Sequence, residues 1–239
     1  MSHPGAELQT QKQEKQAAAR AAVALVESGN IVGLGSGSTA AYAVQFLAER
    51  IREGPGLGLG LKIVGIPTSQ KTRQLAEELK IPLATLAEHS SIDIDIDGAD
   101  EIDPNLNVIK GGGGALLREK IVASISRRFI VIADSSKQVV RLGKFPLPVE
   151  IIPFAEKLIA NRITKIGAEV TLRRGADSNP YVTDEGHHIL DCQFGEIAKP
   201  AALAEKLRAM PGVVEHGLFI GMAEMALIGK GGEVVSLRR

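Results

Sequence analysis

The sequence predicts an α/β protein in which a parallel sheet flanked by helices is followed by a smaller α+β domain. Short apolar runs alternate with helical patterns from residue 31 to residue 134, which is typical of repeated β–α–β units. Three prolines then stand within eight residues, at Pro146, Pro148 and Pro153. Such a cluster marks a change of chain direction and a domain boundary.

The elements before the prolines follow from local patterns. Residues 11–28 are rich in Ala, Gln, Lys and Glu and predict a helix, with Gly29 as its C-terminal stop. "GPGLGLG", 54–60, predicts a flexible loop without chemistry. The other predicted elements are the strands "NIVGL", "LKIVGIP", "SIDIDID" and "RFIVIAD" and the helices "STAAYAVQFLAERI", "SQKTRQLAEELK" and "GALLREKIVASIS".

After the prolines the order changes, which favours an α+β subdomain of about 70 residues. It contains the predicted helices "AEKLIANRITKIG" and "KPAALAEKLRAM" and the predicted strands "AEVTLRR" and "HHILDCQF". "GLFIGMAEMALIG" and "GEVVSLRR" predict two final strands that return to the first domain.

Composition excludes several classes of function. The 28 basic and 28 acidic residues cancel, and the pI is near 7.0, which argues against binding nucleic acid or an anionic membrane surface. We find no apolar run of spanning length and no secretory signal, and a single cysteine, Cys192, excludes an internal disulfide. These features predict a cytoplasmic protein. Cys192 is interpreted as a strand residue rather than a nucleophile, because no nucleophile motif surrounds it.

The stretch "DIDIDGADEID", 93–103, concentrates acidic residues on one strand. Alternation would place one set on each face of that strand, namely Ile92, Ile94 and Ile96 against Asp93, Asp95 and Asp97. One alternative is an edge strand with a solvated acidic face. A calcium loop is disfavoured because its twelfth position, which needs a bidentate Glu, is Pro104. Asp97 and Asp100 lie where the strand ends, at the edge where parallel sheets bind ligands.

"KGGGGALLREK", 110–120, predicts an anion site, because four glycines expose backbone amides beside Lys110 and before a helix. The alternative is a flexible linker. Glu119, in the helix that follows, is by itself typical of a solvated residue, and its closeness to the glycine loop makes it a catalytic candidate.

"GLGSGST", 33–39, is neither a dinucleotide fingerprint nor a P-loop, since Ser38 replaces the third glycine and no Gly-Lys-Ser/Thr follows. Its amides and hydroxyls suit one phosphate monoester at a helix N-terminus, and simple turn and capping chemistry is the alternative. We find no metal-ligand cluster. His187 and His188 are adjacent in a strand and point to opposite faces. Together these groups suit a sugar phosphate that undergoes metal-free proton transfer.

The sequence as a whole resembles ribose-5-phosphate isomerases of the A type. The motifs occur in the family's order and spacing and cover nearly the whole chain: "GLGSGSTA" (33–40), "DGADEID" (97–103), "KGGGGAL" (110–116), "REK" (118–120), "ADSSKQV" (133–139), "LGKFPLPVEIIP" (142–153) and "GVVEHGLF" (212–219). The departures are a longer N-terminus, which bears on the placement of Lys15, and the "GPGLGLG" insertion.

The resemblance implies a fold and an assembly. It implies a Rossmann-like catalytic domain of residues 1–145 plus 218–239 and a smaller α+β, ferredoxin-like lid of residues 146–217. It further implies a homodimer or homotetramer that needs no cofactor and no metal.

The resemblance also implies interconversion of D-ribose 5-phosphate and D-ribulose 5-phosphate through a cis-enediolate. Glu119 would be the base that carries the proton between C2 and C1, and Lys110 with the glycine amides would stabilise the oxyanion. Asp97 and Asp100 would hold sugar hydroxyls. The remaining implied substrate-binding residues are Lys15, Ser36, Gly37, Ser38, Thr39, Gly98, Ala99, Gly111, Gly112, Gly113 and Lys137. Asp93 and Asp103 receive no functional role.

Two rival interpretations stay open. A non-catalytic sugar-phosphate sensor is disfavoured, because no DNA-binding segment precedes the first helix. A CoA-transferase-like enzyme with a Glu nucleophile is disfavoured, because Glu119 follows the "KGGGG" loop in the isomerase arrangement.

Overall fold

A computed structural model describes residues 4–53 and 60–239, so residues 54–59 of the predicted loop at 54–60 lie outside the described residues. The chain forms two compact units. The first unit comprises the residues up to Gly98, Ile121–Lys137 and Met222–Arg239, and the second comprises Ala99–Lys120 and Gln138–Gly221. The predicted domain limits differ from this grouping at 99–120, 138–145 and 218–221, which were predicted for the first domain and fall in the second unit. The domain division stays a prediction.

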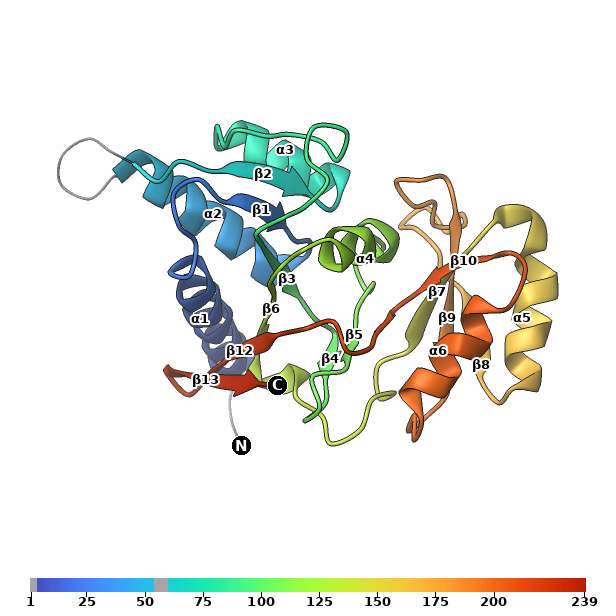
Figure 1. Cartoon of the computed structure of the whole chain (residues 1–239). Helices are drawn as coiled ribbons and strands as arrows, with labels where there is room; N and C mark the ends of the chain where they lie inside the picture. The colour runs from blue at the N-terminus through green and yellow to red at the C-terminus, as the bar shows by residue number, and fades with distance from the viewer. Residues whose placement is uncertain (1–3, 54–59) are drawn as a thin grey trace. The chain divides into compact units, whose positions relative to one another are not determined.

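The first unit contains a mainly parallel six-stranded sheet, as expected for an α/β protein (Figure 1). Its order is β13-β12-β6-β3-β1-β2, and only β12 and β13 run antiparallel. The last predicted strand and the second half of the one before it therefore return to the first sheet, whereas Leu218–Phe219 of that earlier prediction forms a separate short strand in the second unit. The strands are β1 Ile31–Leu34, β2 Val64–Pro67, β3 Ile94–Gly98, β6 Phe129–Asp134, β12 Met225–Lys230 and β13 Glu233–Arg238.

The helices of this unit pack on the sheet through short apolar side chains. α1 and α2 lie side by side (Figure 1), and both contribute to the cluster that receives Ile94 and Ile96 from β3. The predicted stop at Gly29 is wrong, because α1 ends at Val23 and Gly29 lies in the turn that follows. The helical elements are α1 Pro4–Val23, α2 Ser38–Glu53, α3 Gln70–Glu78 and the short 3-10 helix η1 Ser135–Lys137, and α4 Leu116–Ser124 begins in the second unit and ends in this one.

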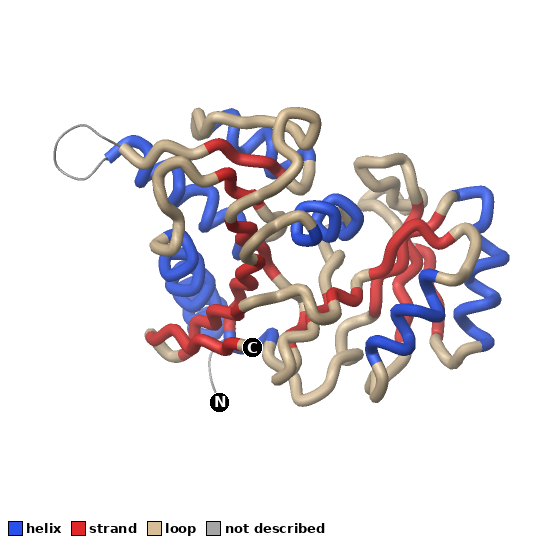
Figure 2. The backbone as a smooth tube through the Cα atoms, in the orientation of Figure 1, coloured by secondary structure: helices blue, strands red, loops and turns tan. Residues whose placement is uncertain are grey.

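The second unit contains smaller antiparallel sheets, which Figure 2 shows as short red strands beside helices. β10-β7-β9-β8 form four strands, and β11-β5-β4 form three. The strands are β4 Glu101–Ile102, β5 Val108–Ile109, β7 Leu147–Ile151, β8 Glu169–Leu172, β9 His188–Gln193, β10 Val213–His216 and β11 Leu218–Phe219. The helical elements are η2 Pro153–Ala155, α5 Glu156–Lys165 and α6 Pro200–Arg208.

Helices α5 and α6 cover one face of the four-stranded sheet, because Ile159 and Leu207 join Leu190 and Cys192 in one apolar cluster. Cys192 is fully buried in β9. Burial raises the pKa of its thiol. A buried thiol with a raised pKa is a poor nucleophile, which agrees with the interpretation of Cys192 as a strand residue.

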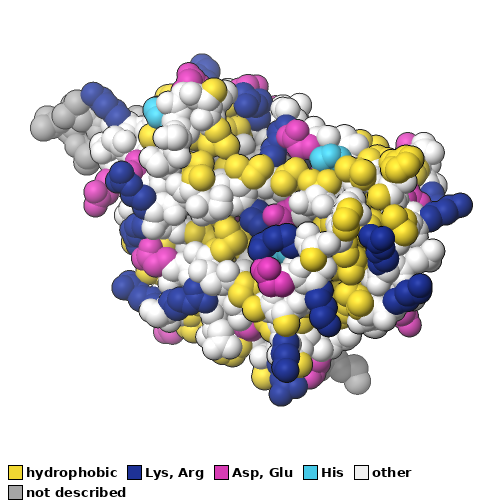
Figure 3. All heavy atoms as spheres, turned by 45° about the vertical axis from the view of Figure 1, so that its right-hand side comes forward, with side chains coloured by type: hydrophobic (Ala, Val, Ile, Leu, Met, Phe, Trp, Pro, Cys, Tyr) yellow, Lys and Arg dark blue, Asp and Glu magenta, His cyan; other side chains and the backbone are white. Residues whose placement is uncertain are grey.

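Surface charge is mixed on the face that Figure 3 presents, where basic and acidic side chains lie among one another. The net charge of zero therefore does not arise from two large patches of opposite sign on that face. In the described part of the chain, no helix has both the length and the apolar character needed to cross a membrane.

Candidate functional site

The "GLGSGST" loop connects β1 to α2 and is held by a cluster of hydroxyl groups. Ser36 Oγ lies 2.8 Å from Thr68 Oγ1, 2.8 Å from Ser69 Oγ and 3.2 Å from Thr72 Oγ1. Thr72 Oγ1 also donates to the Gly35 carbonyl at 3.0 Å. All three partners follow β2 and begin α3, so the next β–α connection fixes the shape of the loop.

Sequence analysis missed these three hydroxyls. They lie in "GIPTSQKT", 65–72, to which no site residue was assigned. Ser69 is the N-cap of α3, and its side chain accepts from the Thr72 N–H. A Thr-Ser pair directly after a buried strand was the available signal, because carboxyl ends of neighbouring parallel strands lie at one edge of a sheet.

The two cationic residues predicted for this loop come from different elements. Lys15, on α1, donates to Ser38 Oγ at 3.1 Å and lies 3.9 Å from the Asp134 carboxylate. It therefore lies beside the predicted phosphate loop. Lys137 ends η1, which follows β6, and its side chain is half-buried. Thr39 is 9% exposed, whereas Gly37 and Ser38 are exposed.

The acidic strand β3 is a central strand, paired with β1 on one side and β6 on the other. The alternative of a solvated edge strand is therefore wrong, and Asp95 and Asp97 are fully buried. Asp97 Oδ1 accepts from the Ser36 N–H at 2.9 Å and from the Gly98 N–H at 2.6 Å. The carboxylate at the end of β3 thus anchors the first residue of the phosphate-type loop that leaves β1.

Two glycines on β1 and just after it make room for these carboxylates. In the register, Gly33 pairs with Asp95, and a Cβ on Gly33 would overlap the Asp95 carboxylate. A Cβ on Gly35 would lie 2.5 Å from the Asp97 Cα. The "GLG" of the loop is thus required by the neighbouring strand, which is a role that sequence analysis did not assign.

The acidic residues without a predicted role are structural. Asp93 accepts from the Ile31 N–H at 2.8 Å and lies 3.3 Å from Arg127. Asp103 accepts from the N–H groups of Asn105 and Asn107 and closes a turn.

Ile92 departs from the predicted alternation. It precedes β3 and packs with Ile66 and Val122 instead of joining the cluster around Ile94.

In the second unit, the "KGGGG" loop has a defined conformation and is not a flexible linker. Gly111 and Gly114 have φ values of +99° and +83°, which non-glycine residues rarely adopt. The Gly112 N–H donates to Asp100 Oδ2 at 2.7 Å. Arg173 donates to the Gly111 carbonyl at 2.8 Å and is itself paired with Asp191.

The loop amides are therefore partly used within the protein. The Gly112 N–H serves Asp100, and the Gly114 N–H donates to the Gly111 carbonyl at 3.0 Å. This leaves the Lys110 ammonium as the main electrophilic group of the segment. Arg173 was not predicted, because it lies more than 60 residues from the loop in sequence.

Lys110 and Glu119 form a buried ion pair. Lys110 Nζ lies 3.4 Å from Glu119 Oε2, and the two side chains are 2% and 5% exposed. The interpretation of Glu119 as a solvated helix residue is therefore wrong. Burying a carboxylate and an ammonium costs several kcal/mol unless each partner compensates the other, so such a pair is expected where charge is used.

These groups suit general acid–base chemistry on an anionic ligand. A buried carboxylate can accept and return a proton, and an adjacent ammonium can stabilise an oxyanion. The loop after β1 offers hydroxyls and amides at the start of α2, which suits a phosphate. Among residues 4–53 and 60–239, we find no group of three or more His, Cys, Asp or Glu side chains placed to hold a metal ion.

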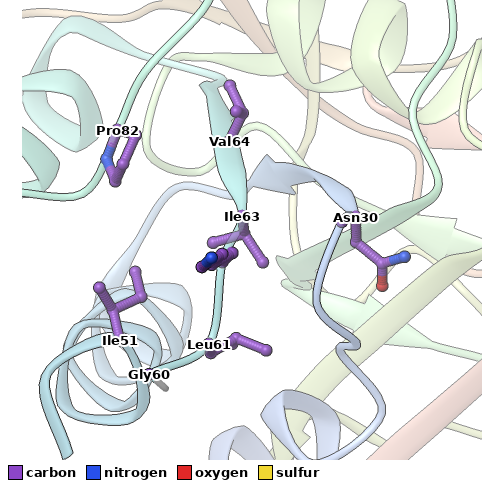
Figure 4. A pocket seen from close by; sticks show the side chains of 9 residues that line it. Asn30, Ile51, Gly60, Leu61, Ile63, Val64 and Pro82 are labelled. Carbon is purple, nitrogen blue, oxygen red and sulfur yellow. The ribbon is translucent and has the colours of Figure 1, made fainter. Parts of the chain in front are cut away.

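A separate hollow lies at the other edge of the six-stranded sheet (Figure 4). It has a volume of about 480 Å³ and is lined mainly by the residues before β1 and by those that lead into β2, including Asn30, Ile63 and Val64, the first residue of β2. None of the predicted site residues lines it.

Comparisons with known proteins agree on one family. A family model described as ribose 5-phosphate isomerase A (phosphoriboisomerase A) matches residues 64–233. The chain is 53% identical over 227 residues to ribose-5-phosphate isomerase A of Synechococcus sp. (strain JA-3-3Ab), covering 94% of this chain and 96% of that protein.

Solved structures give the same result. The ribose 5-phosphate isomerase A of Methanocaldococcus jannaschii superposes with a TM-score of 0.88 at 41% identity, covering 94% of this chain and 98% of that chain. A D-ribose-5-phosphate isomerase in complex with phospho-erythronic acid superposes with a TM-score of 0.90 at 40% identity, covering 94% and 97%.

Proposed function

This chain belongs to the ribose 5-phosphate isomerase A family, and we propose on that premise that it interconverts D-ribose 5-phosphate and D-ribulose 5-phosphate. The observation that carries the proposal is the buried Lys110–Glu119 pair at 3.4 Å. A carboxylate that moves a proton and a cation that stabilises an oxyanion are the two groups that an aldose–ketose isomerisation needs.

In the proposed mechanism, Glu119 removes the proton from C2 of the open-chain aldose. The electron pair of the broken C–H bond forms the C1–C2 double bond, and the aldehyde oxygen becomes an oxyanion. Lys110 stabilises this charge, and one such electrophilic donor is worth about 3–4 kcal/mol. Glu119 then returns the proton to C1, because both carbons present the same face in a cis-enediolate.

We assign the remaining predicted residues to binding. Asp97 and Asp100, flanking Gly98 and Ala99, hold sugar hydroxyls, and Asp100 is oriented by its bond from Gly112. Gly111 and Gly113 add amides near the oxyanion. The phosphate is bound by the loop and cations around β1, namely Ser36, Gly37, Ser38, Thr39, Lys15 and Lys137. The related isomerase solved with phospho-erythronic acid supports a ligand that carries a phosphate.

The finer features of the family stay proposals. They are a Rossmann-like catalytic domain with a ferredoxin-like lid, a homodimer or homotetramer, a cytoplasmic location and independence from metal and cofactor. Sedimentation equilibrium of the full chain distinguishes a dimer from a tetramer, and a monomer at micromolar concentration contradicts both.

The test of the proposed function is turnover of ribose 5-phosphate in EDTA-treated buffer, with ribulose 5-phosphate as the measured product. We expect turnover without added metal. Binding without turnover would favour the sugar-phosphate sensor instead. Turnover that EDTA abolishes and a divalent ion restores would contradict the metal-free mechanism.

A further inference from the structure

One aromatic ring contacts both lysines that flank the proposed base. The Lys110 ammonium lies 5.6 Å from the centroid of the Phe219 ring, and the Lys120 ammonium lies 4.8 Å from it. Phe219 is fully buried, and Lys110 and Lys120 are 2% and 8% exposed. Two buried cations over one phenyl ring are an unusual arrangement, because an ammonium in an apolar site has lost its water.

The backbone fixes Phe219 against the segment that ends in Lys110. β11 pairs antiparallel with β5, with Phe219 opposite Val108 and Leu218 opposite Ile109. The Lys110 N–H donates to the Gly217 carbonyl at 2.9 Å. The short strand that carries the ring therefore sets the position of Lys110 through its main chain as well as through its side chain.

Lys120, the residue after Glu119, is fixed by the same segment. Its ammonium lies 2.7 Å from Glu215 Oε1 and donates to the His216 carbonyl at 2.5 Å. Burial lowers the pKa of Lys120 to about 8, and Glu215 opposes that shift. Glu119 thus lies in a helix whose next residue is tied to residues 215–219 of the chain.

We propose that Phe219 is a positioning residue for the isomerisation, whose ring holds the Lys110 ammonium while Glu119 changes charge. This inference rests on the proposed function. Glu119 is negative before it takes the C2 proton and neutral afterwards, while the negative charge moves to the substrate oxygen, so the electrostatic force on Lys110 changes direction during the step. The ring does not titrate, and its negative face attracts the ammonium throughout the cycle.

The consequence is specific to the intermediate. The ring gives Lys110 a contact that does not change when Glu119 becomes neutral and the negative charge moves to the substrate oxygen. Preorganised charge is effective in catalysis because it does not have to reorganise during the reaction. Weakening the ring's attraction for cations should therefore lower kcat more than it raises KM.

The test replaces Phe219 in the full chain by 4-fluoro-, 3,5-difluoro- and 3,4,5-trifluorophenylalanine, introduced at that position alone. Fluorine withdraws charge from the ring face with little change of shape. We expect kcat to fall stepwise along the series, by about 30-fold at its end, since a desolvated cation–π contact is worth about 2 kcal/mol. KM should change less than about threefold.

The matched control is the same series at Phe194, which packs against the apolar cluster of the same unit. Among the described residues, the rings recorded under a cation are those of Phe46, Phe219 and Tyr181, so Phe194 reports on fluorination itself. An equal decline in kcat at both positions would overturn the proposal. A Phe219 series with unchanged kcat and a lowered Tm would overturn it too, because that ring would serve packing alone.

A second background separates the two lysines. In the double variant Lys120→Met/Glu215→Gln, the second ion pair is replaced by a neutral pair. The stepwise decline in kcat should persist there if Lys110 is the cation that matters. Its disappearance would assign the effect to Lys120 and contradict the proposed role for Lys110. Because wild-type turnover is measured in parallel, failure of the isomerase function is distinguished from failure of this inference.

Discussion

The two glycine-rich loops look alike in sequence and work by different physics. Each loop follows a strand and precedes a helix. The loop after β1 is held by neutral hydroxyls and amides, with Ser36 at the centre of three hydroxyl contacts. The loop after β5 is held by charged groups. Arg173 donates to its carbonyls, and Lys110, at its start, is paired with Glu119 in the helix that follows.

Because one loop is held by neutral groups and the other by charged groups, the two loops are suited to different tasks. Neutral hydroxyls and amides bind a fixed anion without changing protonation state. Buried charges respond to proton transfer, because the low dielectric around them strengthens each change of charge. We therefore expect the first loop to control binding and the second to control chemistry.

The largest effect on stability should come from breaking the buried pair. Lys110→Met leaves the Glu119 carboxylate buried without its ammonium, which should lower the free energy of unfolding by about 3–5 kcal/mol. The double variant Lys110→Met/Glu119→Gln should recover most of that loss and remain inactive. Urea denaturation at pH 7 measures both.

The control for that experiment is Arg208→Met, which breaks the exposed pair with Glu205 and should cost less than about 1 kcal/mol. Equal losses for Lys110→Met and Arg208→Met would mean that burial gives the first pair no special weight.

A pH-dependent stability should report the charged cluster beside the second loop. Burial, and then the Lys120 charge, lower the pKa of His216 to about 4 from 6.5. The unfolded chain binds a proton between these values and the folded chain does not, so stability is full above pH 6.5 and falls as pH drops toward 4. The fall attributable to His216 is at most about 3 kcal/mol.

Unfolding free energies of His216→Gln and wild type between pH 4 and 7.5 measure this contribution, with His89→Gln as the control. The His216 variant should show a flatter dependence on pH than either of the other two proteins. Three parallel curves would contradict the assignment.

Crowding at the first loop should produce a smaller effect. Gly35→Ala places a Cβ 2.5 Å from the Asp97 Cα and should cost about 1–3 kcal/mol of stability. Gly113→Ala meets no atom within 4 Å and should change stability by less than about 0.5 kcal/mol. Thermal unfolding of the two variants compares them, and a reversed order would refute the space requirement at β1.

The smallest effect should be a loss of binding without a loss of rate. Lys15→Met removes a cation from Ser38 and should raise KM about tenfold, equivalent to about 1.4 kcal/mol, with kcat nearly unchanged. Lys12→Met, on the exposed side of the same helix, should leave both constants unchanged. A lowered kcat with an unchanged KM for Lys15→Met would move Lys15 from binding to chemistry.

Local patterns predicted much of this fold. The alternation of strands and helices identified the parallel sheet, and the change of pattern after the proline cluster identified a region of mixed strands and helices. The glycine loops and the carboxylates near them were found because their residues are close in sequence. Short strands such as β4 and β5 were missed, since two residues carry no periodicity.

The supporting contacts could not be predicted, because they depend on register between distant segments. Thr68 reaches Ser36 across 32 residues, and Arg173 reaches Gly111 across 62. The burial of Glu119 depends on packing that its helix pattern does not reveal, since an isolated "LREK" is typical of an exposed face. The two β1 glycines became interpretable only once Gly33 was seen opposite Asp95.

The most direct test of Glu119 as the base of the isomerisation is to measure the turnover and ligand affinity of Glu119→Gln in EDTA-treated buffer, beside wild type and Glu185→Gln. Glu185 is a half-exposed carboxylate of the same unit, paired with Arg118. We expect Glu119→Gln to bind ribose 5-phosphate within threefold of wild type and to lose about 10³-fold in kcat, while Glu185→Gln keeps its rate. If Glu119→Gln keeps most of its activity, the base lies elsewhere, and Asp97 and Asp100 become the next candidates.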